Sequence, residues 1–418
     1  MARSLGDRAN QQMVDRLVGL GALWSPALIA AFRRTPRHRF LDRVHQYDQR
    51  SESWRAVDTR RRRSDQLRLV YADRALITHL SPAAPRSVPV PISSSSQPSL
   101  MAQMLEDLRL RPGQRVLEIG AGTGYNAALI AHVVAPGHVW SVDVDREVLT
   151  DAAAHLRAFA RRPITLRHAD GRAGFAEAAP FDRIVVTAAT SDIEPAWIEQ
   201  LTPDGLLLAP LAVAPGLSYV VCGGAADGVF SGRLMRAAYF MPLRTEGEPG
   251  EVVGESAPPR GPLQTLRAPW ARWFERRFPR QAWRDFIQAF ALFSWLRGLS
   301  LSYRTTEHGQ PSFGTSDARK GHGCWFGPST WQATGEAGRE LATATWRAFL
   351  DAGGPRPTEF RLHAAPLTLP SAPDEGEGKV RRGRPLALLE GRTTFRRCGP
   401  RGQQLWELIE PRERIGEL

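Results

Sequence analysis

The chain has 418 residues and carries a formal net charge of +12, with 42% hydrophobic and 23% charged residues. A single hydrophobic core stops growing near ~250–300 residues, so the length predicts two domains of ordinary globular composition. The polar N-terminus shows no secretion signal, and the longest apolar stretch, 205–215, is too short to span a bilayer. The cysteines are scattered, which argues against a disulfide framework or a zinc site and favours the cytoplasm; they are Cys222, Cys324 and Cys398.

The basic charge comes almost entirely from arginine, since Lys320 and Lys379 are the only lysines. A nucleic-acid-binding face usually combines basic side chains with aromatic residues that stack on bases. The sequence lacks that interleaving. We therefore expect no nucleic-acid partner. The short apolar stretches predict no membrane partner either.

The first 80 residues are expected to form an N-terminal helical region. Apolar residues recur at helical spacing within 10–41, and Pro26 lies in the first turn of a second helix. Residues 48–68 are polar and include the arginine run 60–63, so we expect a solvated loop or insertion there. Residues 81–98 are rich in proline and serine and are expected to form a loop.

An α/β domain is expected over residues 81–245, because strands and helices alternate between short loops. Such alternation predicts a parallel sheet with helices on both faces. Beyond residue 211 the pattern becomes antiparallel, with strands at 217–221 and 237–243 and a turn at 223–228. The other expected elements are helices at 99–108, 125–134, 146–161 and 195–201, strands at 115–119, 139–143, 164–168 and 182–187, and an apolar run at 206–208.

Residues 246–262 are rich in Gly, Pro and Glu and predict a linker to a C-terminal module over 263–418. Eight of the twelve tryptophans fall in this module, which is too many for a disordered segment. Apolar residues at helical spacing mark 283–293 and 341–349, whereas 370–384 is typical of a loop. We expect a small α+β module with its own core.

A glycine-rich turn follows the first strand of the α/β domain. Gly120, Gly122 and Gly124 permit positive φ and a close ligand approach, and the next helix directs free N–H groups at the ligand. Asp143 ends the second strand, where the acid of a Rossmann-type site binds ribose hydroxyls. The G-x-G-x-G spacing differs from the dinucleotide fingerprint and resembles class I S-adenosylmethionine-dependent methyltransferases. That resemblance implies S-adenosylmethionine as the cofactor.

Further motifs narrow this resemblance. They are Ser-Ser-Ser-Ser-Gln-Pro at 93–98, Ala-Asp-Gly at 169–171, Pro-Asp-Gly at 203–205 and Phe-Met-Pro-Leu at 240–243. Together, over about residues 10–245, they resemble the protein-L-isoaspartate O-methyltransferase family. The serine loop and the C-terminal extension are also similar to a subset of that family associated with ribosomal-peptide (RiPP) maturation of the ATP-grasp/graspetide or lanthipeptide kind. The resemblance implies a class I, Rossmann-like fold, mostly parallel with an antiparallel final strand.

The resemblance also implies site residues. The family's catalytic loop falls on 94–98, so Ser96, with Ser94 beside it, takes the place of the serine that contacts the accepting carboxylate. Asp143 stands where the family usually has glutamate, and residues 87–91 replace the family's glycine-rich approach to the loop, which argues against ordinary isoaspartyl proteins as substrates. No metal ligand is implied. The other cofactor residues implied are Glu118, Gly120, Gly122, Gly124, Tyr125, Asp170 and Gly171.

The implied reaction is methyl transfer to an aspartyl or isoaspartyl carboxylate of a peptide or protein. A carboxylate is ionised at neutral pH, so the reaction needs its oxygen positioned rather than a general base, and a serine hydroxyl can orient it. The ester would close to a succinimide (aspartimide) and open largely to isoaspartate. We expect tailoring of a ribosomal precursor peptide held by the C-terminal module. General protein-L-isoaspartate repair is the alternative.

Three rival interpretations stay open. Ser96 would instead cap the following helix, although Ser99 is equally placed for that role. A nucleic-acid or small-molecule methyltransferase on the same fold usually has Asn/Asp-Pro-Pro-aromatic after the fourth strand, where this chain has Thr-Ala-Ala-Thr at 187–190. A cofactor-binding module without catalysis would bind the cofactor but turn over no carboxylate.

Overall fold

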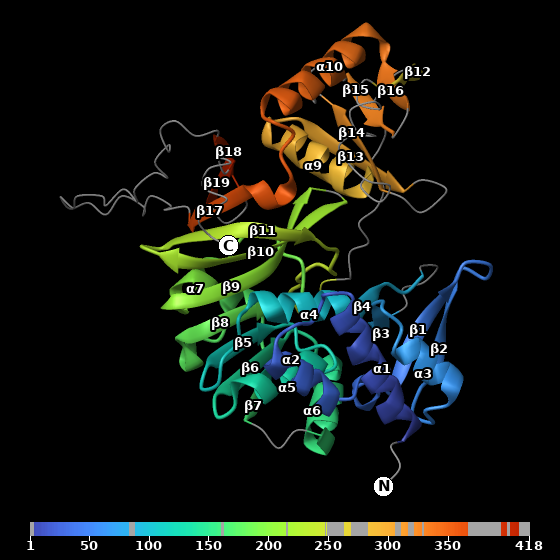
Figure 1. Cartoon of the computed structure of the whole chain (residues 1–418), viewed down its shortest axis with the longest axis vertical. Coiled ribbons are helices and arrows are strands. Elements are labelled where there is room, and N and C mark those ends of the chain that lie inside the picture. The colour runs from blue at the N-terminus through green and yellow to red at the C-terminus, as the bar shows by residue number, and fades with distance from the viewer. Residues whose placement is uncertain are drawn as a thin grey trace, which may run out of the picture.

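The computed structural model describes residues 4–82, 88–159, 163–214, 216–246, 248, 263–268, 283–305, 311–316, 322–327, 330–366, 394–398 and 402–408. In Figure 1 the N-terminal helices lie at one end of the molecule and a C-terminal sheet with two helices lies at the other. Most of the expected linker at 246–262 and the whole loop expected at 370–384 lie outside the described residues. Among the described helices, none is both long enough and apolar enough to cross a membrane.

A ten-stranded sheet runs through the molecule. Its strands are β5 (Arg115–Ile119), β6 (His138–Asp143), β7 (Ile164–His168), β8 (Phe181–Val186), β9 (Leu201–Ala214), β10 (Leu217–Ala226), β11 (Val229–Ala237), β17 (Phe360–Pro366), β18 (Thr394–Cys398) and β19 (Gly402–Leu408). Their order is β18-β19-β17-β11-β10-β9-β8-β5-β6-β7. The strands from β5 to β9 pair in parallel, and the others pair antiparallel. The predicted parallel sheet with an antiparallel end is confirmed.

Helices cover this sheet, as the alternating pattern predicts. They are α4 (Pro98–Asp107), α5 (Tyr125–Val134), α6 (Arg146–Phe159) and α7 (Pro195–Glu199), with the short turns η2 (Gly171–Ala173) and η3 (Ala176–Ala178). The strand β5 is buried from Val116 to Ile119, because a parallel strand between helical layers has no face in water. Since helices cover the faces of the sheet, a ligand can reach it at the carboxyl ends of the parallel strands.

The N-terminal region contains helices, as expected, and also a small sheet. Its elements are α1 (Leu5–Gly19), α2 (Pro26–Arg34), η1 (Arg37–Arg39), β1 (Arg43–Asp48), β2 (Ser53–Asp58), α3 (Ser64–Val70), β3 (Leu76–Leu80) and β4 (Pro91–Ser95). The strands pair antiparallel in the order β2-β1-β3-β4. The loops expected at 48–68 and 81–98 are therefore wrong in part. The hairpin β1–β2 is mostly exposed and β4 is proline- and serine-rich, so neither shows the apolar alternation of a buried strand.

The C-terminal part combines helices and strands, as predicted. It contains β12 (Leu263–Arg267), α9 (Trp283–Leu296), β13 (Ser300–Thr305), β14 (Pro311–Ser316), β15 (Gly323–Phe326), β16 (Thr330–Thr334), α10 (Gly335–Asp351) and η4 (Pro357–Glu359). Five strands form a second sheet in the order β12-β16-β15-β14-β13. The helix α9 contacts both this sheet and β10. Because this helix lies between two sheets, residues 286–294 are all buried, and all but Gln288 and Ser294 are apolar.

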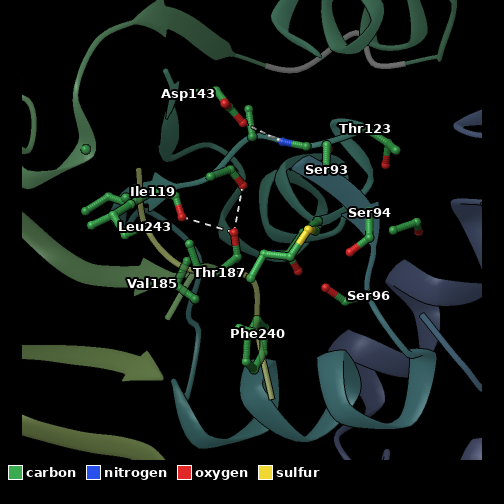
Figure 2. Close-up of a pocket in the computed structure, with 18 of the residues that line it drawn as sticks. Ser93, Ser94, Ser96, Ile119, Thr123, Asp143, Val185, Thr187, Phe240 and Leu243 are labelled. Atoms are coloured by element: carbon green, nitrogen blue, oxygen red, sulfur yellow. Dashed lines mark hydrogen bonds between the residues drawn. The ribbon is translucent and has the colours of Figure 1, made fainter. Parts of the chain in front are cut away.

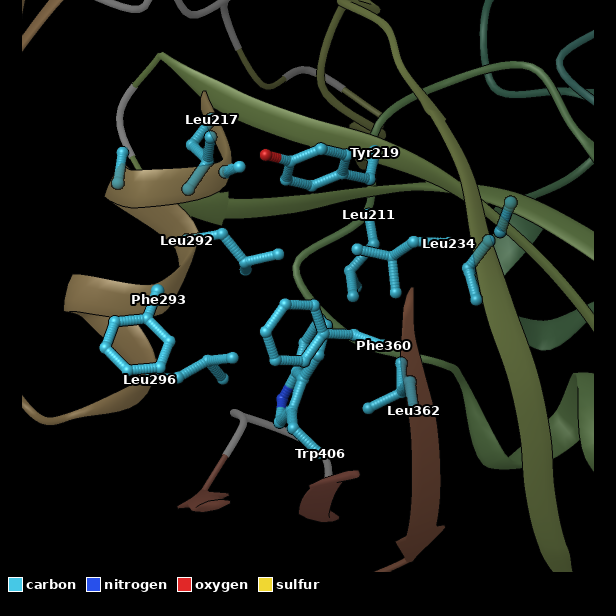
Figure 3. Close-up of a cluster of buried hydrophobic side chains, with 14 of the residues drawn as sticks. Leu211, Leu217, Tyr219, Leu234, Leu292, Phe293, Leu296, Phe360, Leu362 and Trp406 are labelled. Atoms are coloured by element: carbon cyan, nitrogen blue, oxygen red, sulfur yellow. The ribbon is translucent and has the colours of Figure 1, made fainter. Parts of the chain in front are cut away.

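The C-terminal part does not have a core of its own, so that expectation is wrong. One continuous cluster joins Leu217 and Tyr219 of β10 to Leu292 of α9, Phe360 of β17 and Trp406 of β19. Figure 3 shows these side chains converging between the helix and the strands. In addition, β17 pairs with β11, so the C-terminal strands extend the central sheet. The boundaries proposed for the domains stay a prediction.

The expected strand at 237–243 is wrong, because β11 ends at Ala237. The turn expected at 223–228 is shorter than predicted, since β10 continues to Ala226. Residues 240–243 instead return across the sheet, where Ala189 donates to the Met241 carbonyl at 2.8 Å and accepts from Leu243 N–H at 2.7 Å. This return places the Phe-Met-Pro-Leu motif beside the carboxyl ends of the parallel strands.

Candidate active site

A cavity opens at the carboxyl ends of β5, β6 and β8, and its volume is about 1030 Å³ including its open mouth. Figure 2 shows how its walls are arranged. Ser94 and Ser96 form one side and Thr187 faces them, while Asp143 and Phe240 lie toward opposite ends. Residues 92–96, in and directly after β4, and residues 240–244 thus complete a pocket that the parallel strands alone would leave open.

The glycine turn between β5 and α5 forms the floor of this cavity. Gly120, Gly122 and Gly124 have φ of +97°, +52° and +79°, a region that favours glycine. A Cβ on Gly122 would meet only the Ser94 carbonyl, at 3.5 Å, so this backbone faces open space in the cavity. A Cβ on Gly120 would collide with Thr187 Oγ1. The turn therefore presents bare backbone at the start of a ten-residue helix, as the sequence predicts.

Asp143 lines the cavity at the end of β6, where the sequence places it. Its Oδ2 accepts from the Gly122 N–H at 3.1 Å, and its Oδ1 accepts from the Asp145 N–H at 3.1 Å. Burial raises the pKa of this carboxyl, and the two backbone donors oppose that shift. The carboxylate is thus tied to the glycine turn and retains lone pairs for a ligand.

Glu118 lies beneath the glycine turn and does not line the cavity. Its carboxyl group is completely buried and accepts from Ser141 Oγ and, at 2.8 Å, from Asn126 Nδ2. Burial raises its pKa from 4.5 to about 7. Glu118 therefore connects β5, β6 and α5 below the turn, which makes it a support for the site.

Replacing Glu118 with glutamine should flatten the dependence of stability on pH. The folded protein keeps the Glu118 proton up to about pH 7, whereas the unfolded chain releases it near pH 4.5. The raised pKa of Glu118 therefore contributes fully to the free energy of unfolding below pH 4.5, and this contribution is lost as the pH rises through 7. Relative to wild type, the free energy of unfolding of Glu118→Gln should rise by on the order of 3 kcal/mol over this range. Denaturant unfolding at several pH values measures it.

The matched control for this experiment is Glu199→Gln, which changes an exposed glutamate at the end of α7. It should follow the wild-type curve. A Glu118→Gln variant that also followed the wild-type curve would show that the buried carboxyl does not hold its proton to neutral pH.

The remaining predicted cofactor residues differ in position. Tyr125 lines the cavity but is only 2% exposed, and its ring packs against Phe40 with centroids 5.3 Å apart. Gly171 also lines the cavity. Asp170 does not, because its carboxylate caps η2 by accepting from the Arg172 N–H at 2.9 Å and pairs with the Arg172 guanidinium at 3.3 Å.

The sequence did not indicate Thr187, which lines the cavity, or Trp197, which lies behind its wall residue Gly171. Thr187 Oγ1 donates to the carbonyls of Ile119 and Gly120, at 3.0 and 2.8 Å, and so joins β8 to the glycine turn. Trp197 is fully buried and donates from Nε1 to the Gly171 carbonyl at 2.8 Å. Both act through contacts distant in sequence, so no local motif indicates them.

The hydroxyls of Ser94, Ser95 and Ser96, at the end of β4 and directly after it, do not all point the same way. Figure 2 shows Ser94 and Ser96 turned toward the cavity. Ser95 is 4% exposed, and its hydroxyl instead accepts from the buried guanidinium of Arg37. The helix α4 begins at Pro98 with Gln97 as its N-cap and without a side-chain cap. The interpretation of Ser96 as a helix cap is therefore wrong.

Residues 8–248 match the sequence profile of the family described as protein-L-isoaspartate(D-aspartate) O-methyltransferase (PCMT). The chain belongs to this family. It is 33% identical over 248 residues to the protein-L-isoaspartate O-methyltransferase of Hyperthermus butylicus, covering 56% of this chain and 88% of that one. It is 37% identical over 180 residues to that of Yersinia enterocolitica, covering 42% of this chain and 85% of the other.

Membership of the protein-L-isoaspartate O-methyltransferase family confirms the class I fold with its mostly parallel sheet. It also confirms the predicted enzyme, an S-adenosylmethionine-dependent carboxyl methyltransferase, and its cofactor. The family match ends at residue 248, so the C-terminal strands and helices, α9 and α10 among them, lie beyond it.

Proposed function

We propose that the cavity positions an aspartyl or isoaspartyl carboxylate of a peptide between Ser94 and Ser96 on one side and the glycine turn on the other. The observation that carries the proposal is the pair of hydroxyls turned into the cavity opposite the bare backbone of the turn. S-adenosylmethionine fits that turn, because Gly122 leaves open space, the N-terminus of α5 supplies N–H groups and Asp143 offers acceptors for ribose hydroxyls. When bound, it supplies a methyl group on a sulfonium.

The residues of this site suit a reaction without a general base. The acceptor carboxylate would take up the methyl group through an already ionised oxygen while the sulfonium leaves as a neutral thioether, so no residue of the site would have to accept a proton. Ser94 and Ser96 would donate to the acceptor and fix its free oxygen on the line of attack, which is catalysis by positioning. The apolar side chains of Ile119, Phe240 and Leu243 would keep water away from the reacting atoms.

Substitution of Ser96 by alanine should lower kcat/KM for an isoaspartyl peptide by about 10- to 100-fold, because one donor to the carboxylate is lost. The Kd of S-adenosylmethionine, measured by calorimetry, should stay within about twofold of wild type. Ser94→Ala should act in the same direction.

Ser99→Ala is the matched control, since its hydroxyl accepts from Gln97 Nε2 outside the cavity. Equal kinetics in Ser96→Ala and Ser99→Ala would refute the assignment of Ser96 to the acceptor site.

For the physiological substrate we propose tailoring of a ribosomal precursor peptide. The support is the run of four serines at 93–96, in and directly after β4, and the long chain beyond residue 248. In this proposal the next backbone nitrogen attacks the methyl ester and expels methanol, and water then opens the resulting succinimide to isoaspartate. General isoaspartyl repair fits the same site equally well, and mass spectrometry on the two kinds of peptide separates the two roles. Methylation of an isoaspartyl peptide alone would refute the tailoring role.

The C-terminal part remains our candidate for holding the peptide, but four of its tryptophans do not support that role. Trp325, Trp331, Trp346 and Trp406 are each at most 5% exposed and form the core. Removing the chain after residue 246 would also strip β17 from the edge of β11 and uncover the shared core. Loss of activity in such a truncation would therefore not identify a peptide-binding surface.

A further inference from the structure

A buried arginine lies directly behind the serine strand, by which we mean β4 together with Ser96. Arg37, in η1, is completely buried and belongs to none of the cavity walls. Its guanidinium donates to the carbonyls of two separate segments, the turn after α3 and the end of β4. The acceptors are Val70 O at 2.7 Å, Ala72 O at 3.3 Å, Arg74 O at 3.4 Å, Ser95 O at 3.1 Å, Ser96 O at 2.9 Å and Ser95 Oγ at 3.2 Å.

All of these acceptors are neutral. Within the described part of the chain no carboxylate forms an ion pair with Arg37. Burial lowers the pKa of its guanidinium to about 10, so the side chain stays a cation at neutral pH. The Asp73 carboxylate acts on this charge without pairing with it directly. A buried charge without a directly paired carboxylate is costly, and hydrogen bonds to carbonyl oxygens only partly offset that cost.

The contacts explain what this cation does to the serine strand. The same guanidinium nitrogen, Nη2, donates to both Ser95 O and Ser96 O, so these consecutive carbonyls must point away from the cavity. The Ser95 hydroxyl is drawn to the same side. The Ser96 side chain is left on the opposite side, toward the cavity, as Figure 2 shows.

We propose that Arg37 is a positioning residue for methyl transfer. It fixes the Ser95–Ser96 backbone so that the Ser96 hydroxyl faces the acceptor, and its positive charge favours a carboxylate at that place. The inference rests on the proposed function, because it assumes that the acceptor lies beside Ser96. A planar guanidinium bonds several carbonyls at fixed angles, whereas an ammonium is a single compact donor. Arg37→Lys therefore keeps the charge and loses the geometry, and Arg37→Met loses both.

The experiment compares wild type, Arg37→Lys, Arg37→Met and Arg183→Met. Arg183 is the matched control because it is also a buried arginine, 8% exposed, that donates to the Leu108 carbonyl away from the cavity. The measurements are thermal unfolding, the Kd of S-adenosylmethionine, and kcat and KM for an isoaspartyl peptide. Ser95→Ala, which removes only the hydroxyl contact, replaces Arg37→Met if that variant does not fold.

We expect Arg37→Lys to lower kcat about tenfold with a smaller change in the KM of the peptide. Arg37→Met should lower kcat/KM about tenfold further, because it also raises the KM of the peptide. The Kd of S-adenosylmethionine should stay within about twofold in both. Ser95→Ala should lower kcat by a few-fold. If the wild-type enzyme methylates the peptide and Arg37→Lys has the same kcat and KM as wild type, the role of Arg37 is overturned but the proposed function is not. A wild-type enzyme that methylates no carboxylate would overturn the proposed function and this inference with it.

Discussion

Replacing Gly122 with alanine should weaken S-adenosylmethionine binding by about 100-fold or more, corresponding to at least about 3 kcal/mol. The new methyl group would meet only Ser94 O at 3.5 Å, so the folded chain has room for it. It would nevertheless occupy the open space over the glycine turn where the cofactor must approach the backbone. Isothermal titration calorimetry with S-adenosylmethionine measures the effect.

The control for Gly122→Ala is Gly113→Ala. Gly113 also has positive φ, +86°, and a Cβ there would meet no atom within 4 Å. The two variants thus carry similar backbone strain, about 1–2 kcal/mol, but only one changes the cavity. Similar Kd values for the two variants would contradict the assignment of the turn to the cofactor.

Replacing Asp143 with alanine should weaken S-adenosylmethionine binding by roughly 10- to 100-fold. Hydrogen bonds to a charged group contribute about 1.5–3 kcal/mol, and the ribose would lose its carboxylate acceptor. The Gly122 N–H, which donates to Asp143 at 3.1 Å, would also lose its partner, so the turn itself should loosen. Calorimetric titration and methyl transfer at limiting cofactor both report the change.

Asp145→Ala is the matched control for Asp143→Ala, because Asp145 is acidic and lies two residues away but outside the cavity. Its Oδ1 accepts from the N–H groups of Glu147 and Val148 at the start of α6. The variant should lose about 1 kcal/mol of stability as a lost helix cap, with the Kd unchanged. A Kd that rises equally in both variants would argue against Asp143 as the ribose ligand.

The sequence predicts the glycine turn and the position of Asp143 in the cavity because these parts are local. A buried strand, three alternating glycines and a helix are contiguous, and Asp143 follows at the end of the next strand. Local patterns of this kind determine both the conformation of the turn and its position in the sheet. The helix α9 is also predicted from the sequence, because apolar residues recur in it at helical spacing.

The side of the cavity that we propose for the acceptor depends on contacts that no local pattern contains. Arg37 reaches Ser95 across 58 residues, and Thr187 reaches Gly120 across 67. The strand β4 is short and polar, so it has no alternation to distinguish it from a loop. For the same reason the sequence did not reveal that β17 pairs with β11 and extends the central sheet. Pairing between distant strands follows from the fold as a whole.

The most direct test of the central claim is mass spectrometry of a peptide incubated with the enzyme and S-adenosylmethionine. The peptide carries one isoaspartyl residue, and its partner peptide carries a precursor-like normal aspartate. We predict a methyl ester on the acceptor carboxylate of at least one peptide, which mild base converts to a succinimide. The Ser96→Ala enzyme should form it more slowly. Absence of the ester from both peptides, or a methyl group that resists base, would contradict carboxylate methylation at this cavity.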